Sequence, residues 1–181
     1  MAKEFYKHLG ATLLFFGVIS LLRFELSLGL VELWIGALLG TFILDIDHLI
    51  FTYLTRPGHP TSVALRQYIE RRDFKGGLLY FGQHHKEHVE LSFHSAIFQV
   101  LFLGFAFFVL TSTAGFLGKG LVMAAGLHLL VDEVSDLFED EGHLKKWLFW
   151  QFKEGTISAY GTRIYVGLMI LVFLGLSVFL L

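Results

Sequence analysis

Three clusters of histidine and aspartate interrupt the apolar stretches of this sequence, and they are the residues best suited to chemistry. They are Asp45-Ile46-Asp47-His48, Phe93-His94-Ser95, and His128 followed by Asp132. His128 and Asp132 share one face of a helix because they are four residues apart. Asp45 and His48, three residues apart, also share a face, whereas Asp47 points elsewhere on an ideal helix. Since an ionisable group in a membrane helix is costly unless paired or bound, each cluster is a candidate site.

The residue types indicate a metal site. The sequence has no cysteine, so thiolate ligands, iron–sulfur clusters and cysteine nucleophiles are excluded. Imidazole and carboxylate ligands suit Zn, Mn, Fe or Co better than Ca or Mg. The clusters could hold one ion or two. Two ions about 3.5–4 Å apart would activate a water for hydrolysis of an ester or phosphoester.

Each cluster also has a purely structural explanation. His128 and Asp132 could form a hydrogen-bonded pair that stabilises helix packing. The cluster that begins at Asp45 could be a polar helix end. His94 and Ser95 could cap the helix that follows them, because serine is a favoured N-cap residue.

Other polar residues lie close to these clusters in the sequence. His84, His85 and His88 belong to a charged stretch in which solvated side chains are common. In the same stretch, Glu87 or Glu90 could act as a general base.

Three more polar groups lie within or beside apolar runs. Asp136 continues the face of His128 and Asp132 and could be a further ligand or orient one. Glu32 and Gln99 are isolated in apolar runs, and for each we expect a hydrogen bond between helices.

The composition predicts a membrane protein. Of the 181 residues, 55% are hydrophobic and only 17% are charged, against about 25% charged in an ordinary soluble domain. The mean hydropathy is +0.64. A water-soluble globule and a disordered chain are therefore excluded. The net charge of −2 gives no indication of a nucleic-acid partner, and we expect the lipid bilayer as the partner. The length fits a single domain over residues 1–181.

Five apolar runs predict an all-α, multi-pass bundle of helices that span or nearly span the membrane. They cover residues 8–22, 26–44, 96–113, 121–131 and 164–181. Residues 55–92 predict a polar loop with one short surface helix, from Ser62 to Arg72, that ends before Gly76 and Gly77. A charged amphipathic stretch around Trp147 follows the fourth run and suits the membrane interface.

Lysine and arginine in the loops predict the orientation. Six of them lie in residues 55–92 and four in residues 132–163, whereas the loops of the other side hold only Arg23 and Lys119. The N-terminus, the loop 55–92 and the amphipathic stretch are therefore expected on the cytoplasmic side. This topology, drawn without the histidine and aspartate clusters, brings all three to one depth at the cytoplasmic face. We expect a metal pocket there.

The order of the clusters resembles that of the membrane-bound metal-dependent hydrolases, small multi-pass proteins distantly similar to zinc-dependent phospholipase C. The resemblance covers roughly residues 36–136 and rests on the three motifs in the family's order. It implies a divalent metal, in the first place Zn, and a hydrolase. The metal ligands that it implies are Asp45, Asp47, His48, His94, His128 and Asp132.

Two positions depart from the family's pattern. Leu44 stands where the family has a proline before the first aspartate. The family also has a His-Arg pair five residues before the histidine of its His-Ser motif. This chain has Val89 there, with His88 one residue earlier. Either His84, His85 or His88 completes the site through a shifted loop, or one ligand is missing.

The sequence thus predicts a membrane metal-dependent hydrolase that acts on an ester or phosphoester. A pocket at the interface would suit a lipid-like substrate with an apolar tail and a polar head. Two other functions stay open: a non-enzymatic membrane protein with a structural metal, and a metal or proton transporter, since Asp and His inside membranes also serve as ion relays.

Overall fold

The computed structural model describes residues 2–24, 26–153 and 155–181, and in these ranges the chain is helical, without a strand. The α-helices are α1 (Ala2–Arg23), α2 (Leu28–Ile43), α3 (Ile46–Ile50), α4 (Pro60–Glu70), α5 (Phe74–His84), α6 (Ala96–Thr111), α7 (Phe116–Glu139), α8 (Glu141–Leu148) and α9 (Ala159–Ser177). Short turns of other helix types cover Phe51–Thr55, His85–Glu87 and Val178–Leu180.

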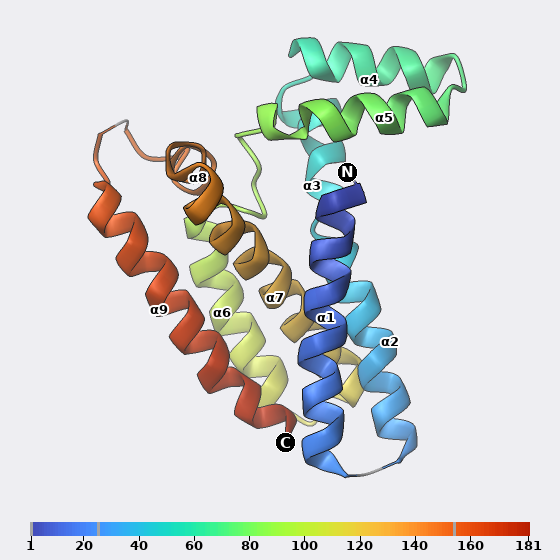
Figure 1. Ribbon diagram of the computed structural model, residues 1–181, viewed down its shortest axis with the longest axis vertical. Helices are drawn as coiled ribbons and strands as arrows, with labels where there is room; N and C mark the ends of the chain where they lie inside the picture. Colours follow the sequence, from blue (N-terminus) through green and yellow to red (C-terminus); the bar gives the residue numbers. More distant parts are fainter. Residues whose placement is uncertain (1, 25, 154) are drawn as a thin grey trace.

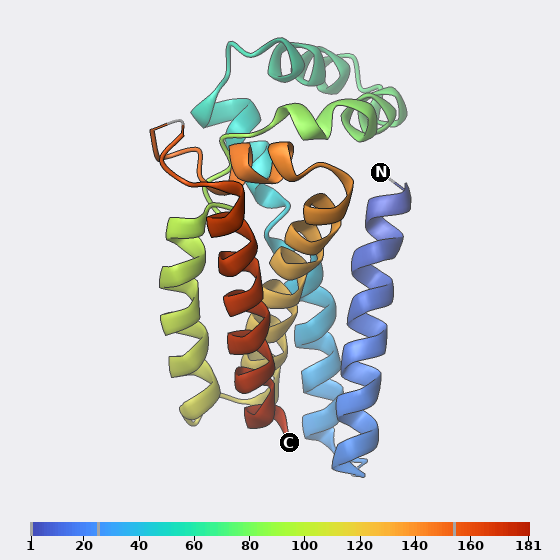
Figure 2. The same ribbon diagram turned by 60° about the vertical axis from the view of Figure 1, so that its left-hand side comes forward.

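The long helices α1, α2, α6, α7 and α9 run side by side, and α4 and α5 lie across one end of them (Figures 1 and 2). Among the described residues, three stretches are long and apolar enough to cross a membrane: Glu4–Arg23, Leu28–Thr55 and Ala159–Leu180. Helix α6 is apolar but shorter, and α7 carries charged residues. The all-helical fold is therefore as predicted, with three of the five expected spans meeting this criterion.

Helices α2 and α7 touch through their backbones. A Cβ atom on Gly36 would lie 2.0 Å from the carbonyl oxygen of Leu117, and one on Gly40 would lie 2.2 Å from that of Leu121. On α7, a Cβ atom on Gly120 would meet the carbonyl oxygen of α2's Leu33 at 2.2 Å. Small residues four apart permit such close approach of helices. This contact holds the end of α2 against the part of α7 that carries the polar cluster.

Residues 60–84 form a hairpin of two helices, where the sequence predicts one helix and a loop. Gly76 and Gly77 lie inside α5, although glycine usually weakens a helix. They are accommodated because a Cβ atom on Gly77 would lie 3.1 Å from the Cβ of Tyr68, so the two helices pack closely. Asp73 caps α5 by accepting a hydrogen bond from the Gly76 amide. The expected helix end before the glycines is confirmed, because α4 ends at Glu70, but the loop expected after it is wrong, because α5 forms there.

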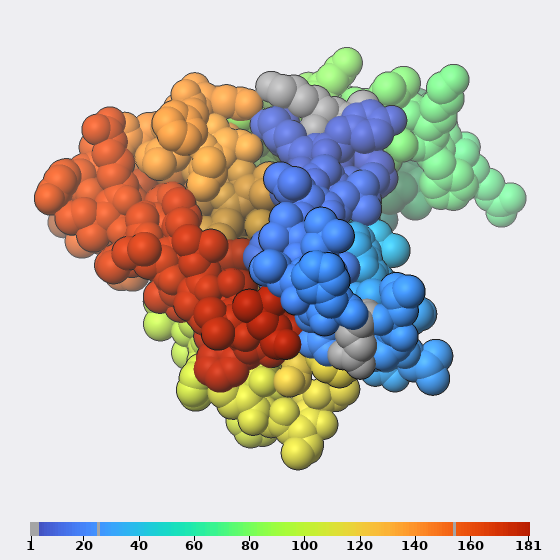
Figure 3. All heavy atoms as spheres, turned by 60° about the horizontal axis from the view of Figure 1, so that its bottom comes forward, coloured from blue at the N-terminus to red at the C-terminus, as the bar shows by residue number. Residues whose placement is uncertain are grey.

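The core is apolar at the end away from the hairpin. Figure 3, in which that end comes forward, shows α1 and α2 beside α9, with the turn between α6 and α7 next to them. Buried side chains there include Phe16, Leu33, Leu110 and Leu180. The buried histidines and aspartates lie toward the hairpin. The fold therefore separates an apolar half from a half that holds polar groups.

Candidate metal centre

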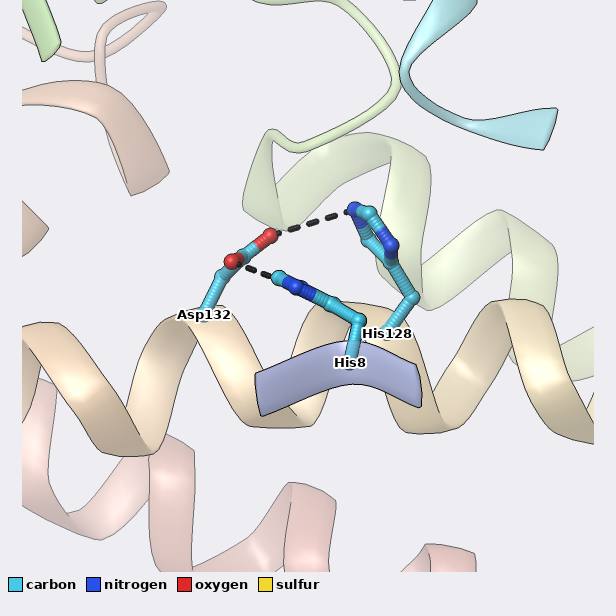
Figure 4. Close-up of side chains that lie close together, drawn as sticks. All are labelled: His8, His128 and Asp132. Atoms are coloured by element: carbon cyan, nitrogen blue, oxygen red, sulfur yellow. Dashed lines mark ion pairs between the residues drawn. The ribbon is translucent and has the colours of Figure 1, made fainter. Parts of the chain in front are cut away.

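Four polar side chains from three separate parts of the chain meet below the hairpin. His8 comes from α1, His94 from the turn before α6, and His128 and Asp132 from one face of α7. The three histidines are buried. Figure 4 shows His8 and His128 with their rings turned toward the Asp132 carboxylate. Ligand atoms of these three residues lie within 4.8 Å of one another, an arrangement that could hold a metal ion.

Each of the three imidazoles is held at Nδ1 by an oxygen that only accepts hydrogen bonds. The partners are the Glu4 carbonyl for His8 at 2.9 Å, the Asp47 carboxylate for His94 at 3.2 Å, and the Thr41 carbonyl for His128 at 2.7 Å. Nδ1 must therefore carry the proton in all three rings. The hydrogen bond at one ring nitrogen fixes the state of the other, so in the neutral rings each Nε2 presents a lone pair.

These Nε2 atoms converge on one another and on Asp132. His94 Nε2 lies 3.3 Å from His128 Nε2, and His128 Nε2 lies 3.3 Å from Asp132 Oδ2. The distance from His94 Nε2 to Asp132 Oδ2 is 3.7 Å. Atoms bound about 2.0–2.1 Å from a tetrahedral zinc ion lie about 3.3–3.4 Å apart, so this spacing fits one ion. Without a cation or an extra proton, lone pairs would face each other.

His8 faces the other carboxylate oxygen of Asp132 (Figure 4). Its Nε2 lies 3.0 Å from Asp132 Oδ1, yet this buried atom makes no hydrogen bond. The His8 ring also packs on the His128 ring, with 4.1 Å between centroids. A buried acceptor beside a carboxylate oxygen is costly unless something positive lies between them. His8, His128 and Asp132 are thus available to an ion, and His94 lies beside His128 and Asp132.

The two aspartates of the first cluster take different positions. Asp47 is 1% exposed, and its Oδ2 accepts hydrogen bonds from the Phe93 amide and from His94 Nδ1. It therefore orients the His94 ring through Nδ1, the ring nitrogen that does not face His128. Asp45 has a half-exposed side chain that borders a cavity, and its Oδ1 lies 3.8 Å from His128 Nε2. A modest movement of its side chain would bring Asp45 to an ion at the centre.

His48 lies beside the centre but contacts a different group. Its Nδ1 is 3.1 Å from His88 Nδ1, and the other ring nitrogen of His88 is 3.1 Å from the hydroxyl of Thr61. That hydroxyl is in turn 2.7 Å from His59 Nδ1. Burial, together with neighbouring His59 and His85, lowers the pKa of His88 to about 4. The His88 ring is therefore neutral at physiological pH.

Of the three loop histidines, the structure brings only His88 against a member of the first cluster. His84 and His85 bond through Nδ1 to the carbonyls of Tyr80 and Gly82 in their own segment. Glu90, a candidate base, is paired with Arg56 through two contacts of 2.7 Å.

Asp136 forms a separate network beside the centre. It accepts hydrogen bonds from Lys86 at 3.0 Å, from His143 Nδ1 at 2.6 Å and from Trp147 Nε1 at 2.8 Å. The hydrogen bond to Asp136 raises the pKa of His143. With its carboxylate occupied by these donors, Asp136 acts as an anchor between α7, α8 and the loop.

A cavity of about 310 Å³ lies in front of the centre. Polar residues of the centre, including His8, Asp45, His94 and Asp132, form part of its wall. Apolar side chains that also line it are Phe5, Phe42, Leu78 and Phe81. The first two stack, with 5.1 Å between ring centroids. The cavity therefore offers a polar part and an apolar part to a ligand.

The hydrogen bonds expected for Gln99, Ser95 and Glu32 can be compared with the structure. Gln99 donates to the His94 carbonyl at 2.9 Å and accepts from the Tyr165 hydroxyl of α9 at 2.8 Å, so the expected helix–helix hydrogen bond is confirmed. Ser95 accepts from the Phe98 amide at 3.3 Å and caps α6 as expected. Glu32 makes no such bond with the residues that the structure describes.

His8 is the residue that the sequence reasoning missed. A signal for it exists: His8 opens the first apolar run, whose start the predicted topology places at the same depth as the other clusters. No protein-family model, curated protein or solved structure matches the chain. Its chemistry must therefore be inferred from the centre itself.

Proposed function

We propose that the protein is an integral membrane, metal-dependent hydrolase that cleaves an ester or phosphoester bond. The observation that carries the proposal is the convergence of three histidine Nε2 atoms on the carboxylate of Asp132. The resemblance of the motifs to the membrane-bound metal-dependent hydrolases supports the same chemistry, by analogy only.

His8, His94, His128 and Asp132 would hold a divalent ion, with Zn the first candidate and Mn, Fe or Co as alternatives. Such an ion activates a water for attack on an ester or phosphoester. Asp47 and the Thr41 carbonyl fix the orientation of the His94 and His128 rings. A hydrogen bond of this kind to the ring nitrogen that does not bind the metal usually raises the basicity of the nitrogen that does.

Asp45 is the residue we assign to proton transfer. Its carboxylate is half exposed, borders the cavity and lies closer to the centre than Glu87 or Glu90, neither of which lines that cavity. A general base must reach the attacking water within hydrogen-bond distance.

A lipid-like molecule is the substrate class that the cavity fits best. Its wall combines the polar centre with Phe5, Phe42 and Leu78, and it lies at the end of the candidate spans. A polar headgroup would reach the centre while an apolar tail contacts the aromatic side chains and the bilayer.

A structural metal is the second candidate, because one observation favours it. Four protein donors are enough to close a tetrahedral site, and closed sites are structural, whereas catalytic sites keep a position open. The cavity in front of Asp45 favours the hydrolase. Transport finds less support, since the half of the core away from the centre is apolar.

The test uses detergent-purified protein with p-nitrophenyl butyrate, bis-p-nitrophenyl phosphate and phosphatidylglycerol in mixed micelles. We expect turnover that a chelator removes and Zn or Mn restores. Asp45→Asn should lower kcat by about 10²–10⁴-fold while the metal stays bound. His84→Ala, at a site away from the cavity, is the matched control. Bound metal without turnover on any of these substrates would instead favour the structural site.

A further inference from the structure

One face of α5 carries a row of apolar side chains that begins beside the cavity and extends away from it along the helix. Phe74, Leu78 and Phe81 are spaced four and three residues apart, so they lie on the same side of the helix. Phe81 contacts His48, with 4.8 Å between ring centroids. Leu78 lines the cavity. Phe74, one turn further out, is 67% exposed.

Helix α4 packs along a neighbouring side of α5. Gly77 packs closely against Tyr68 of α4, and the Tyr68 and Tyr80 rings lie 5.6 Å apart. In both ribbon views α5 lies between α4 and the level of the long helices (Figures 1 and 2), and in Figure 1 the hairpin projects sideways beyond α1 and α2. Leu78 lines the cavity together with Phe5 of α1 and Phe42 of α2, so the face with Phe74 and Leu78 is turned toward the level at which the candidate spans end.

Beside this face lie a further exposed apolar side chain and several basic ones. Leu79 is 61% exposed, and Arg71, Arg72 and Lys75 at the hairpin tip are exposed as well. The acidic residues nearby are Glu70 and Asp73, and the Asp73 carboxylate caps the helix. Apolar residues interspersed with lysine and arginine are typical of helices that lie in the membrane interface.

We propose that α5 rests in the headgroup region of the bilayer that the long helices span, with Phe74, Leu78 and Leu79 inserted and Arg71, Arg72 and Lys75 on anionic headgroups. The apolar face continues directly into the surface of the spans, which exposes Leu39, Ile43 and Ile46 at and near this end. A bilayer is the one occupant that covers both. Basic residues near an anionic surface strengthen the attachment of the helix to it. Lipid then reaches the cavity from the side, along α5.

The absence of cysteine from the sequence makes the test direct, because one introduced cysteine carries one nitroxide. We would label Phe74→Cys, Leu79→Cys and, on the other helix of the hairpin, Gln67→Cys. In nanodiscs of phosphatidylcholine with phosphatidylglycerol, positions 74 and 79 should be accessible to oxygen and protected from a water-soluble nickel complex. Their depth should be about 5–10 Å into the interface. Position 67 should show the reverse.

Equal access of the nickel complex to all three positions would overturn the proposal, since α5 would then face water. Dipolar broadening between labels at position 74 would also overturn it, because a second copy would cover the face. Removing phosphatidylglycerol, or changing Lys75→Glu with Arg71→Glu and Arg72→Glu, should move the labels toward water. An unchanged depth in both would refute the role of the basic residues. None of these readouts depends on metal or turnover.

Discussion

Asp132 is the residue on which the other side chains of the centre converge. One carboxylate oxygen faces His8 at 3.0 Å and the other faces His128 at 3.3 Å. The rings cannot donate from Nε2 while Nδ1 holds their proton, unless they are charged. A bound cation would remove this conflict for all of them at once, which is why we propose a metal at this centre.

At the residue scale, Asp47→Asn tests whether Asp47 strengthens metal binding by orienting the His94 ring. The amide can still occupy the space, but it orients the His94 ring less strongly and lowers its basicity. Loss of such a partner typically reduces metal affinity about 10–100-fold. We expect that reduction in a zinc titration with a competing chelator, with the helical content unchanged. Unaltered affinity would show that Asp47 does not act through His94.

A pH effect is expected from His143, whose two ring nitrogens both meet acceptors. Nδ1 bonds Asp136 and Nε2 bonds the Lys86 carbonyl at 2.8 Å, so the charged ring is favoured and its pKa is raised from 6.5. The unfolded chain has the lower pKa. The stabilisation is therefore complete below pH 6.5 and is lost as the pH rises through the raised pKa.

The measurement for His143 is the melting temperature of the wild type and of His143→Gln, which is neutral at every pH, between about pH 6 and about pH 9. The wild type should exceed the variant most at the acidic end, and the difference should shrink as the pH rises. A difference that stays constant or grows would contradict the assignment.

The sequence was sufficient to single out His94, His128 and Asp132, because buried charges stand out in apolar runs. It could not separate ligands from their supports. Asp47 bonds to His94 Nδ1 and does not join the converging Nε2 atoms. This placement depends on the turn between α2 and α3, whose geometry helix periodicity does not describe. His8 was missed because its partners lie more than a hundred residues away.

At the element scale, the contact between α2 and α7 positions the centre. The Thr41 carbonyl reaches His128 only because Gly36 and Gly40 let the two backbones touch. In the sequence these glycines are only part of an apolar run, because their role in packing depends on which helix faces them. For the same reason the sequence does not predict that Gly76 and Gly77 lie inside a second helix.

Gly36→Ala tests this contact. The new methyl group would lie 2.0 Å from the Leu117 carbonyl oxygen, so the helices must separate. Overpacking of this kind costs about 1–3 kcal/mol, and the centre should lose metal affinity with it. Gly17→Ala is the matched control because nothing lies within 4 Å of its added Cβ. Equal stability of the two variants in detergent would show that α2 and α7 tolerate separation.

At the scale of the whole molecule, the polar centre, the hairpin and α8 lie at one end, and an apolar core fills the other. The composition predicted the helical fold because few other structures satisfy the backbone in lipid. It did not predict that the loop would fold into a hairpin beside the cavity, since that depends on contacts between α4, α5 and α3.

The predicted orientation can be checked with single cysteines in inverted membrane vesicles. Gln67→Cys on the hairpin should react with a membrane-impermeant maleimide from the cytoplasmic side. Leu26→Cys, between α1 and α2 and 99% exposed, should react only from the opposite side. Labelling of both positions from one side would show that the charge distribution in the loops misassigned the topology.

The most direct test of the metal centre is elemental analysis of the detergent-purified protein, before and after incubation with Zn or Mn. The variants His8→Ala, His94→Ala and Asp132→Asn would be measured beside it, with His84→Ala as the control. We predict one or two transition-metal ions per chain in the wild type and the control, and their loss in the three variants. Absence of metal from the folded wild type, or its full retention in all three variants, would contradict the centre and the hydrolase with it.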